Sequence, residues 1–152
     1  MFENKVAYIT GGTKGIGFGI AKILLQNGIN VAITGRKKAD VDHAVSELSP
    51  DSSKVLGIVS DVRNFEEEVQ AVSAIKNHFG RLDYVIANAG LGVFKSVDEL
   101  SIEDWNDMIG TNLSGLFYTL KASMEELKKS EGYFISIYSI AGTNFFEKGS
   151  GY

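Results

Sequence analysis

A glycine-rich segment near the N-terminus has the composition of a phosphate-binding turn. Residues 10–17 read Thr-Gly-Gly-Thr-Lys-Gly-Ile-Gly. Glycine lets the backbone turn sharply and lie close to a pyrophosphate, and a following helix offers free N–H groups and a positive dipole end to anionic oxygens. The alternative is a tight strand-to-helix turn that binds nothing. A P-loop is excluded, because residues 12–15 lack the Gly-Lys-Ser/Thr order that magnesium binding requires.

The segments on either side of this turn must position it. Val6–Ile9 is a short apolar run, which is typical of a strand buried on both faces. Apolar residues then recur at helical spacing from Ile16 until Gly28, and Val31–Ile33 is a second apolar run. Together they form one βαβ unit of about 30 residues, the length expected for dinucleotide binding.

The alternation of strand-like and helix-like segments continues through the rest of the chain. In order, the pattern predicts a helix over residues 40–48, a strand over 55–59, a helix from Asn64 to Gly80, a strand over 82–87, a loop over 91–100, a long helix from Ser101 and a strand over 133–137. This order predicts an α/β, Rossmann-like, doubly wound parallel sheet. Residues 1–152 then form a single dinucleotide-binding domain.

Two of these helices have features beyond their periodicity. Glu67 follows Asn64 by three residues in a capping-box arrangement, ahead of a predicted buried stripe. The stripe consists of Val69, Val72, Ile75 and Phe79. The long helix has a broad apolar face with Asn112 inside it, where an amide is costly without partners. One interpretation is that Asn112 bonds nearby backbone carbonyls.

The residues after the second strand indicate which dinucleotide is bound. An acidic residue in this place holds the ribose hydroxyls of NAD, and Gly35–Lys38 contains none. Arg36, together with Lys14, has the charge and geometry to pair with a ribose 2′-phosphate. We therefore expect NADP(H) to be favoured over NAD(H). The alternative is that Arg36 is a surface arginine in a polar loop.

Composition excludes several other classes of function. The chain of 152 residues has a net charge of −4 and no long basic cluster, so nucleic acid is not an expected partner. No cysteine is present, and His43 and His78 stand alone, so no metal site is expected. No signal peptide and no apolar run long enough to span a membrane is predicted. A cytoplasmic location is expected.

Four ordered signals resemble the short-chain dehydrogenase/reductase family, most closely its 3-oxoacyl-carrier-protein reductase branch. The glycine turn has the wider spacing T-G-x-x-x-G-x-G, and Asp61-Val62 follows the third strand. Asn-Ala-Gly at residues 88–90 follows the fourth strand at once. Ser139 follows the fifth strand and precedes Tyr152 by 13 positions (152 − 139 = 13), the separation of the family's active serine and tyrosine. Ser136 is the competing serine, but it lies within the strand.

The resemblance implies roles for individual residues. Asp61 would accept from the adenine amino group, although it is equally placed as a helix-approach residue, and Asn88 would brace the sheet. Tyr152 would be the catalytic acid, Ser139 would hold the substrate oxygen, and Asn112 would kink the long helix and hold a water of the proton relay. The implied coenzyme-binding residues are Gly11, Thr13, Lys14, Gly15, Ile16, Gly17, Arg36, Asp61, Val62, Asn88, Ala89 and Gly90.

The function implied is NADP(H)-dependent hydride transfer to or from a small carbonyl or secondary alcohol substrate, in a homo-oligomer. In the family a lysine follows the tyrosine in the fourth position, and further strands complete the sheet. Residues 1–152 hold no counterpart of these. We therefore expect only the first five strands, with an open edge at the fifth, uncovered apolar surface on the long helix, and an inactive, self-associating 152-residue chain. The alternative is a catalytically inactive, truncated dinucleotide-binding or scaffold protein.

Overall fold

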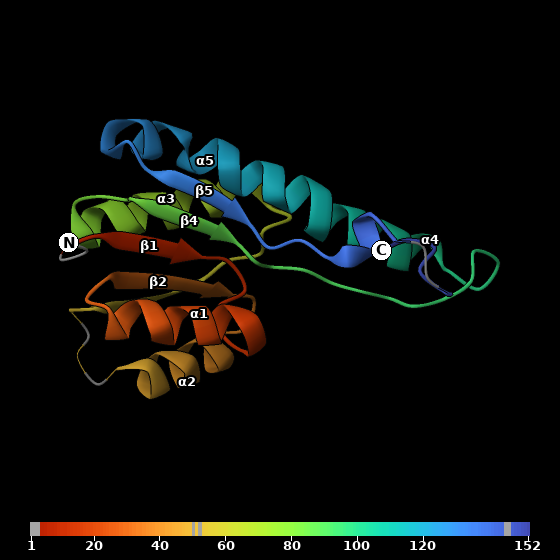
Figure 1. The fold of residues 1–152 in the computed structure, drawn as a ribbon, viewed down its shortest axis with the longest axis horizontal. Coiled ribbons are helices and arrows are strands. Elements are labelled where there is room, and N and C mark those ends of the chain that lie inside the picture. Colours follow the sequence, from red (N-terminus) through yellow and green to blue (C-terminus); the bar gives the residue numbers. More distant parts are fainter. Residues whose placement is uncertain (1–3, 50, 52, 145–146) are drawn as a thin grey trace.

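A parallel sheet with helices on both faces forms the centre of this computed structural model, which describes residues 4–49, 51, 53–144 and 147–152. The elements are β1 (Val6–Ile9), α1 (Gly15–Gln26), β2 (Asn30–Gly35), α2 (Lys38–Leu48), β3 (Val55–Val59), α3 (Phe65–Phe79), β4 (Tyr84–Ala87), α4 (Ile102–Ile109), α5 (Gly115–Ser130) and β5 (Tyr133–Ser136). The strand order is β3-β2-β1-β4-β5, and every pairing is parallel (Figure 1). The predicted Rossmann-like fold is confirmed.

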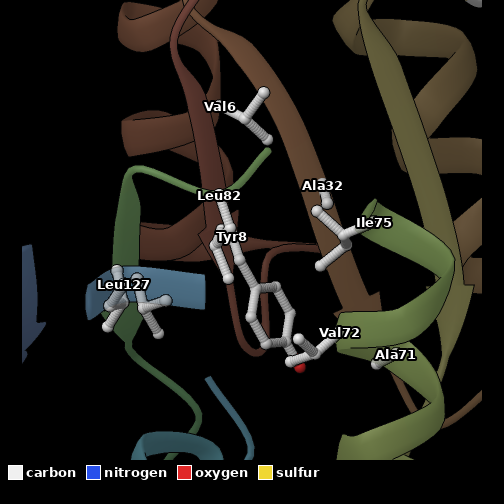
Figure 2. Close-up of a cluster of buried hydrophobic side chains, with 9 residues drawn as sticks. Val6, Tyr8, Ala32, Ala71, Val72, Ile75, Leu82 and Leu127 are labelled. Carbon is white, nitrogen blue, oxygen red and sulfur yellow. The ribbon is translucent and has the colours of Figure 1, made fainter. Parts of the chain in front are cut away.

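Alternate residues of the central strands pack into separate layers on the two faces of the sheet. Val6 and Tyr8 of β1 belong to one buried cluster with residues of α3 and α5, whereas Ala7 and Ile9 belong to another with residues of α1 and α2. Figure 2 shows the first of these layers, with the ring of Tyr8 beside Val72 of α3. Because both faces are covered, the strands are apolar throughout, as expected for a buried parallel sheet.

Helix α3 begins and ends at the residues that the sequence predicts. Asn64 Oδ1 accepts from the N–H of Glu66 at 3.1 Å and of Glu67 at 3.4 Å, and Gly80 ends the helix with φ of 79°. The reciprocal main-chain bond of a capping box is absent among the described residues, because the N–H of Asn64 donates to the carbonyl oxygen of Asp61 at 2.8 Å. Glu67 accepts instead from Asn64 Nδ2 at 2.9 Å and from the N–H of Asp61 at 2.8 Å. The predicted buried stripe is wrong at Val69, which is 40% exposed.

Several predicted boundaries need correction. β4 begins two residues late because the carboxylate of Asp83, rather than a main-chain carbonyl, takes the N–H of Val6. α2 begins at Lys38 rather than Asp40, and β5 ends at Ser136 rather than Ile137. The predicted long helix is interrupted by a π-helical turn at Gly110–Ser114, which separates α4 from α5.

β5 forms one edge of the sheet among the described residues. Its Tyr133 is 67% exposed, and apolar side chains of α4, of the π-helical turn and of α5 are exposed as well. These helical residues are Ile102, Trp105, Leu113 and Phe117. Among the described residues, β5 is therefore paired on one side only and these apolar side chains are uncovered. In the described part of the chain, no helix is long and apolar enough to cross a membrane.

Candidate functional site

The glycine-rich turn joins β1 to the N-terminus of α1 at the carboxyl edge of the sheet. Gly11 has φ of +64°, and a Cβ there would lie 3.0 Å from Cα of Ala89, so this position needs glycine. Helix α1 begins at Gly15 with no side-chain cap and no acidic residue in its first turn. Its free N–H groups can therefore receive an anion.

Asn88 ties this turn to the end of β4. Its Nδ2 donates to the carbonyl oxygens of Thr10 at 3.0 Å and of Gly11 at 3.2 Å. Gly17, in the first turns of α1, packs directly against this amide, and a Cβ at Gly17 would lie 2.8 Å from the oxygen of Gly11. The structure therefore places Asn88 where the predicted bracing of the sheet requires it.

A first pocket of about 440 Å³ opens at this edge between the ends of β1, β2, β3 and β4. All the predicted coenzyme residues except Gly17 line it: Gly11, Thr13, Lys14, Gly15, Ile16, Arg36, Asp61, Val62, Asn88, Ala89 and Gly90. Gly17 is buried beneath Asn88, so its position suits packing, and direct contact with a coenzyme stays a prediction. Lys14 and Arg36 are exposed, which leaves their cationic groups accessible to a ligand.

Sequence reasoning missed Thr34 and Ser60, which also line the first pocket. Thr34 is 1% exposed, and its Oγ1 has no hydrogen-bond partner of acceptable geometry in the described part of the chain. The available signal was their position at the carboxyl edge, since Thr34 is the second-last residue of β2 and Ser60 follows β3.

Asp61 is held by Arg63 at the wall of the first pocket. The guanidinium donates from Nε at 3.0 and 3.1 Å to the two carboxylate oxygens and from Nη2 at 2.7 Å. These hydrogen bonds lower the pKa of Asp61, and the charges of Arg63 and Arg36 act in the same direction. Asp61 is therefore fixed as an ionised acceptor, and the remaining guanidinium nitrogen of Arg63, Nη1, pairs with Asp107 of α4.

Asn112 lies in the π-helical turn between α4 and α5. Its Oδ1 accepts from the N–H of Leu91 at 2.8 Å, and its Nδ2 donates to the oxygen of Leu91 at 2.8 Å. Both halves of the amide are thus satisfied by one residue of the 91–100 loop. The predicted distortion of the helix is present at Asn112, and its side chain makes backbone bonds, while a water-holding role stays a prediction.

A second pocket, of about 730 Å³, adjoins the first and contains the three predicted catalytic residues, Asn112, Ser139 and Tyr152. The ring of Tyr152 packs edge-on against Phe94 with centroids 5.4 Å apart, and a Cβ at Gly92 would meet this ring at 3.2 Å. Ser139 Oγ accepts from the N–H of Ala141 at 3.2 Å and so begins a short 3₁₀ turn. Phe94 was not foreseen, because loop residues give no periodic signal.

Two further points from the sequence concern the competing serine, Ser136, and the presence of a metal site. Ser136 also lines the second pocket, but it is exposed on β5, whereas Ser139 is half-buried. In the described residues, no three His, Cys, Asp or Glu side chains are grouped closely enough to hold a metal ion.

Comparisons with known proteins agree with this geometry. A family model described as short chain dehydrogenase matches residues 5–152. Uncharacterized oxidoreductases of Staphylococcus aureus strain MW2 and Staphylococcus saprophyticus are 36% and 32% identical, over 93% and 99% of this chain. The X-ray structure of an alcohol dehydrogenase from Thermococcus sibiricus, complexed with 5-hydroxy-NADP, superposes with a TM-score of 0.92 at 36% identity over 97% of this chain.

The chain spans less than two thirds of each of these relatives. It covers 61% of the Staphylococcus aureus protein, 65% of the Staphylococcus saprophyticus protein and 63% of the Thermococcus sibiricus chain.

Proposed function

Because the chain belongs to the short-chain dehydrogenase family, we propose that its first pocket binds NADP(H) and that the protein transfers a hydride between nicotinamide and a small carbonyl or secondary alcohol substrate. The observation that carries this proposal is the junction of the two pockets. They share a wall formed by Ile16, Val62, Asn88, Ala89, Gly90, Leu91 and Thr111. A ligand lying along this wall reaches from the N-terminus of α1 to Ser139 and Tyr152.

The residues of the first pocket fit a dinucleotide. The uncapped start of α1 suits a diphosphate, and the fixed carboxylate of Asp61 suits an amino-group donor such as adenine. The exposed cations Lys14 and Arg36 suit a ribose 2′-phosphate, which supports NADP(H) over NAD(H). The solved relative that was complexed with 5-hydroxy-NADP supports the same choice.

When bound, the coenzyme supplies or accepts the hydride, and the protein must handle the accompanying proton. In reduction, the substrate oxygen needs an acid within hydrogen-bond reach, and Tyr152 has the phenolic O–H for this role. The Ser139 hydroxyl would hold the same oxygen. Asn112 would keep the π-helical turn and the loop at Leu91 in register beside them, through the two bonds described above.

The proposal also covers the branch of the family, the cellular location and the assembly of the protein. We assign the protein to the 3-oxoacyl-carrier-protein reductase branch, in a cytoplasmic homo-oligomer. The branch predicts that 3-oxoacyl thioesters are reduced faster than simple ketones. The competing function is a dinucleotide-binding or scaffold protein without turnover.

Calorimetry with NADPH and NADH on the folded protein tests the coenzyme site first. We expect NADPH to bind more tightly than NADH, and absence of uptake of either coenzyme would overturn the proposal. Turnover is then followed by NADPH absorbance in a form of the protein that carries the family's lysine after Tyr152, because residues 1–152 alone are expected to be inactive. The substrates are a 3-oxoacyl thioester and a simple ketone with NADPH, and a secondary alcohol with NADP⁺. Binding without turnover of any substrate class would favour the scaffold function.

A further inference from the structure

One carboxyl group is completely buried between the two pockets. Glu68, on α3, is 0% exposed, and none of the ion pairs formed by the described residues includes it. Its partners are hydroxyl groups from three other parts of the fold. Tyr8 Oη of β1 lies 3.1 and 3.0 Å from Oε1 and Oε2, and Ser60 Oγ lies 2.8 Å from Oε1. Thr119 Oγ1 of α5 lies 2.8 Å from Oε2.

These partners connect Glu68 to both pockets. Ser60 lines the first pocket and Thr119 lines the second. Thr119 Oγ1 also lies 2.9 Å from the carbonyl oxygen of Gly115, the residue that follows the π-helical turn containing Asn112. A change at Glu68 therefore reaches one residue of each pocket and the start of α5.

The number of available protons indicates which protonation state of Glu68 allows every hydrogen bond of the cluster to form. The hydroxyls of Tyr8, Ser60 and Thr119 carry one proton each, and Thr119 has two acceptors within reach, Glu68 and Gly115. If Glu68 is ionised, Thr119 can serve only one of them. If Glu68 is protonated, its own O–H donates to Thr119, Thr119 donates to Gly115, and Ser60 and Tyr8 donate to the remaining oxygen.

The electrostatic surroundings of Glu68 also favour its protonated form. Burial raises the pKa of Glu68, the hydroxyls of Ser60, Thr119 and Tyr8 oppose this, and the negative charge of Glu67 on the same helix adds to the rise. Burial and the neighbouring Glu68 also raise the pKa of Tyr8, so Tyr8 stays a neutral donor. Among the described residues, the charge that acts on the carboxyl is the negative one of Glu67, and the contacts from β1, from Ser60 after β3 and from Thr119 on α5 are neutral hydroxyls.

We propose that Glu68 is a positioning residue whose protonated form holds the walls of the two pockets together, and that its ionisation weakens coenzyme binding. The inference rests on the proposed function, since it needs the first pocket to take NADP(H). Ionisation draws the single proton of Thr119 away from Gly115, which loosens the first turn of α5. By reciprocity, bound coenzyme must favour the protonated form of Glu68.

The first experiment follows the Glu68 carboxyl carbon by ¹³C NMR as a function of pH, without coenzyme and with saturating NADPH. We expect the carboxyl to titrate above the ordinary value of 4.5, and its midpoint to rise further with NADPH. A midpoint at the ordinary value, or one that NADPH leaves unmoved while it binds, would overturn the proposal.

The second experiment measures NADPH affinity across the same pH range in wild type, Glu68→Gln and Glu66→Gln. We expect the wild-type affinity to fall at least about fivefold through the transition, the lower end of typical coupling between sites. Glu68→Gln imitates the protonated form, so its affinity should stay level. The matched control Glu66→Gln, exposed on the same helix, should follow wild type. Equal pH profiles in wild type and Glu68→Gln would contradict the proposal.

If Glu68→Gln does not fold, a second variant, Ser60→Ala, still tests the proposal. Ser60→Ala removes a donor that favours the ionised carboxylate, so both the NMR midpoint and the affinity transition should move to higher pH. A transition that stays in place or moves to lower pH would count against the inference. If wild type binds no NADPH, the proposed function and the coupling fail together. If NADPH binds and Glu68 titrates normally, this inference fails alone.

Discussion

Asn88 donates two hydrogen bonds to Thr10. The backbone N–H of Asn88 donates to Thr10 Oγ1 at 3.0 Å, and Asn88 Nδ2 donates to the carbonyl oxygen of Thr10 at 3.0 Å. The N–H of Ala89 also donates to Thr10 Oγ1, at 3.1 Å. The two sequence motifs that end β1 and β4 are thus one hydrogen-bonded unit, and the shared wall of the two pockets is built on it.

Thr10→Val should destabilise this unit. Valine has the same shape but leaves two N–H groups without their acceptor, which costs about 1–3 kcal/mol for each buried group. The measurement is the free energy of unfolding by denaturant, without coenzyme. The matched control is Thr34→Val, because Thr34 is equally buried but, among the described residues, its hydroxyl accepts from no backbone N–H. The control should be neutral or stabilising, and equal losses in both variants would refute the argument.

Gly17→Ala should reduce both stability and coenzyme affinity. A Cβ at Gly17 would collide with the amide of Asn88 and the oxygen of Gly11, and overpacking of this kind costs about 1–3 kcal/mol. Gly19, on the same helix, has open space around it, so Gly19→Ala should instead stabilise α1 by about 0.5–1 kcal/mol. Thermal unfolding and NADPH calorimetry measure the two effects. A tolerated alanine at Gly17 would show that Asn88 is less constrained than the structure indicates.

Most of the fold could be predicted because local patterns and tertiary structure agree. Val6–Ile9 reads as a buried strand and is β1, and Asn64 and Gly80 bound α3 as their backbone chemistry dictates. The boundary errors occur where residues far away in the sequence determine the local structure. β4 begins late because Asp83 binds Val6, 77 positions away, and no window of sequence contains both residues.

Less of the candidate site than of the fold could be predicted from the sequence. The glycines and Asn88 were recognised by their spacing, but the hydroxyl cluster around Glu68 was not. Three consecutive glutamates at the start of a helix resemble a solvated first turn, and only the packing of α3 on the sheet shows that Glu68 points inward. The interruption at Asn112 was expected only through family resemblance, since apolar periodicity continues across it.

Arg36→Ala should change the coenzyme preference. Loss of a charged hydrogen bond to the 2′-phosphate costs about 1.5–3 kcal/mol, which lowers NADPH affinity by about 10- to 100-fold. NADH lacks this phosphate, so its affinity should hold. Lys38→Ala is the control, because Lys38 is exposed nearby but pairs with Asp42 at 2.7 Å and does not line the first pocket. A parallel loss of NADPH and NADH affinity would argue against a 2′-phosphate contact.

In a form of the protein that carries the family's lysine after this tyrosine, Tyr152→Phe should slow turnover strongly while leaving coenzyme binding intact. The change removes the phenolic O–H and keeps the ring that packs against Phe94. General acid catalysis contributes about 10²- to 10⁴-fold, so single-turnover rates should fall by that factor. Tyr133→Phe, on the exposed edge of β5, is the matched control and should retain full activity. Turnover that survives in Tyr152→Phe would remove Tyr152 from the catalytic role.

Asp83→Asn should lower stability in a pH-dependent way. The Asp83 carboxylate, 1% exposed, accepts from Lys5 Nζ at 2.7 Å, Arg81 Nε at 2.7 Å and the N–H of Val6 at 3.0 Å. Burial pushes the pKa of Asp83 up, but these donors outweigh it, so the pKa is lowered from 3.8. We expect a loss of about 2 kcal/mol at neutral pH, below the 3–5 kcal/mol of a fully buried pair, because both cations are partly exposed.

The pH dependence of this loss separates charge from shape. A depressed carboxyl pKa contributes stability that is present above the unfolded value and disappears as the pH falls through the folded one. The gap between wild type and Asp83→Asn, measured by urea unfolding from pH 7 downward, should therefore begin to narrow near pH 3.8 and close further below it. Asp42→Asn removes an exposed pair with Lys38 and should change stability by less than about 0.5 kcal/mol at any pH. A gap that stays constant on acidification would mean that Asp83 acts through packing, because only the ionised carboxylate gains from Lys5 and Arg81.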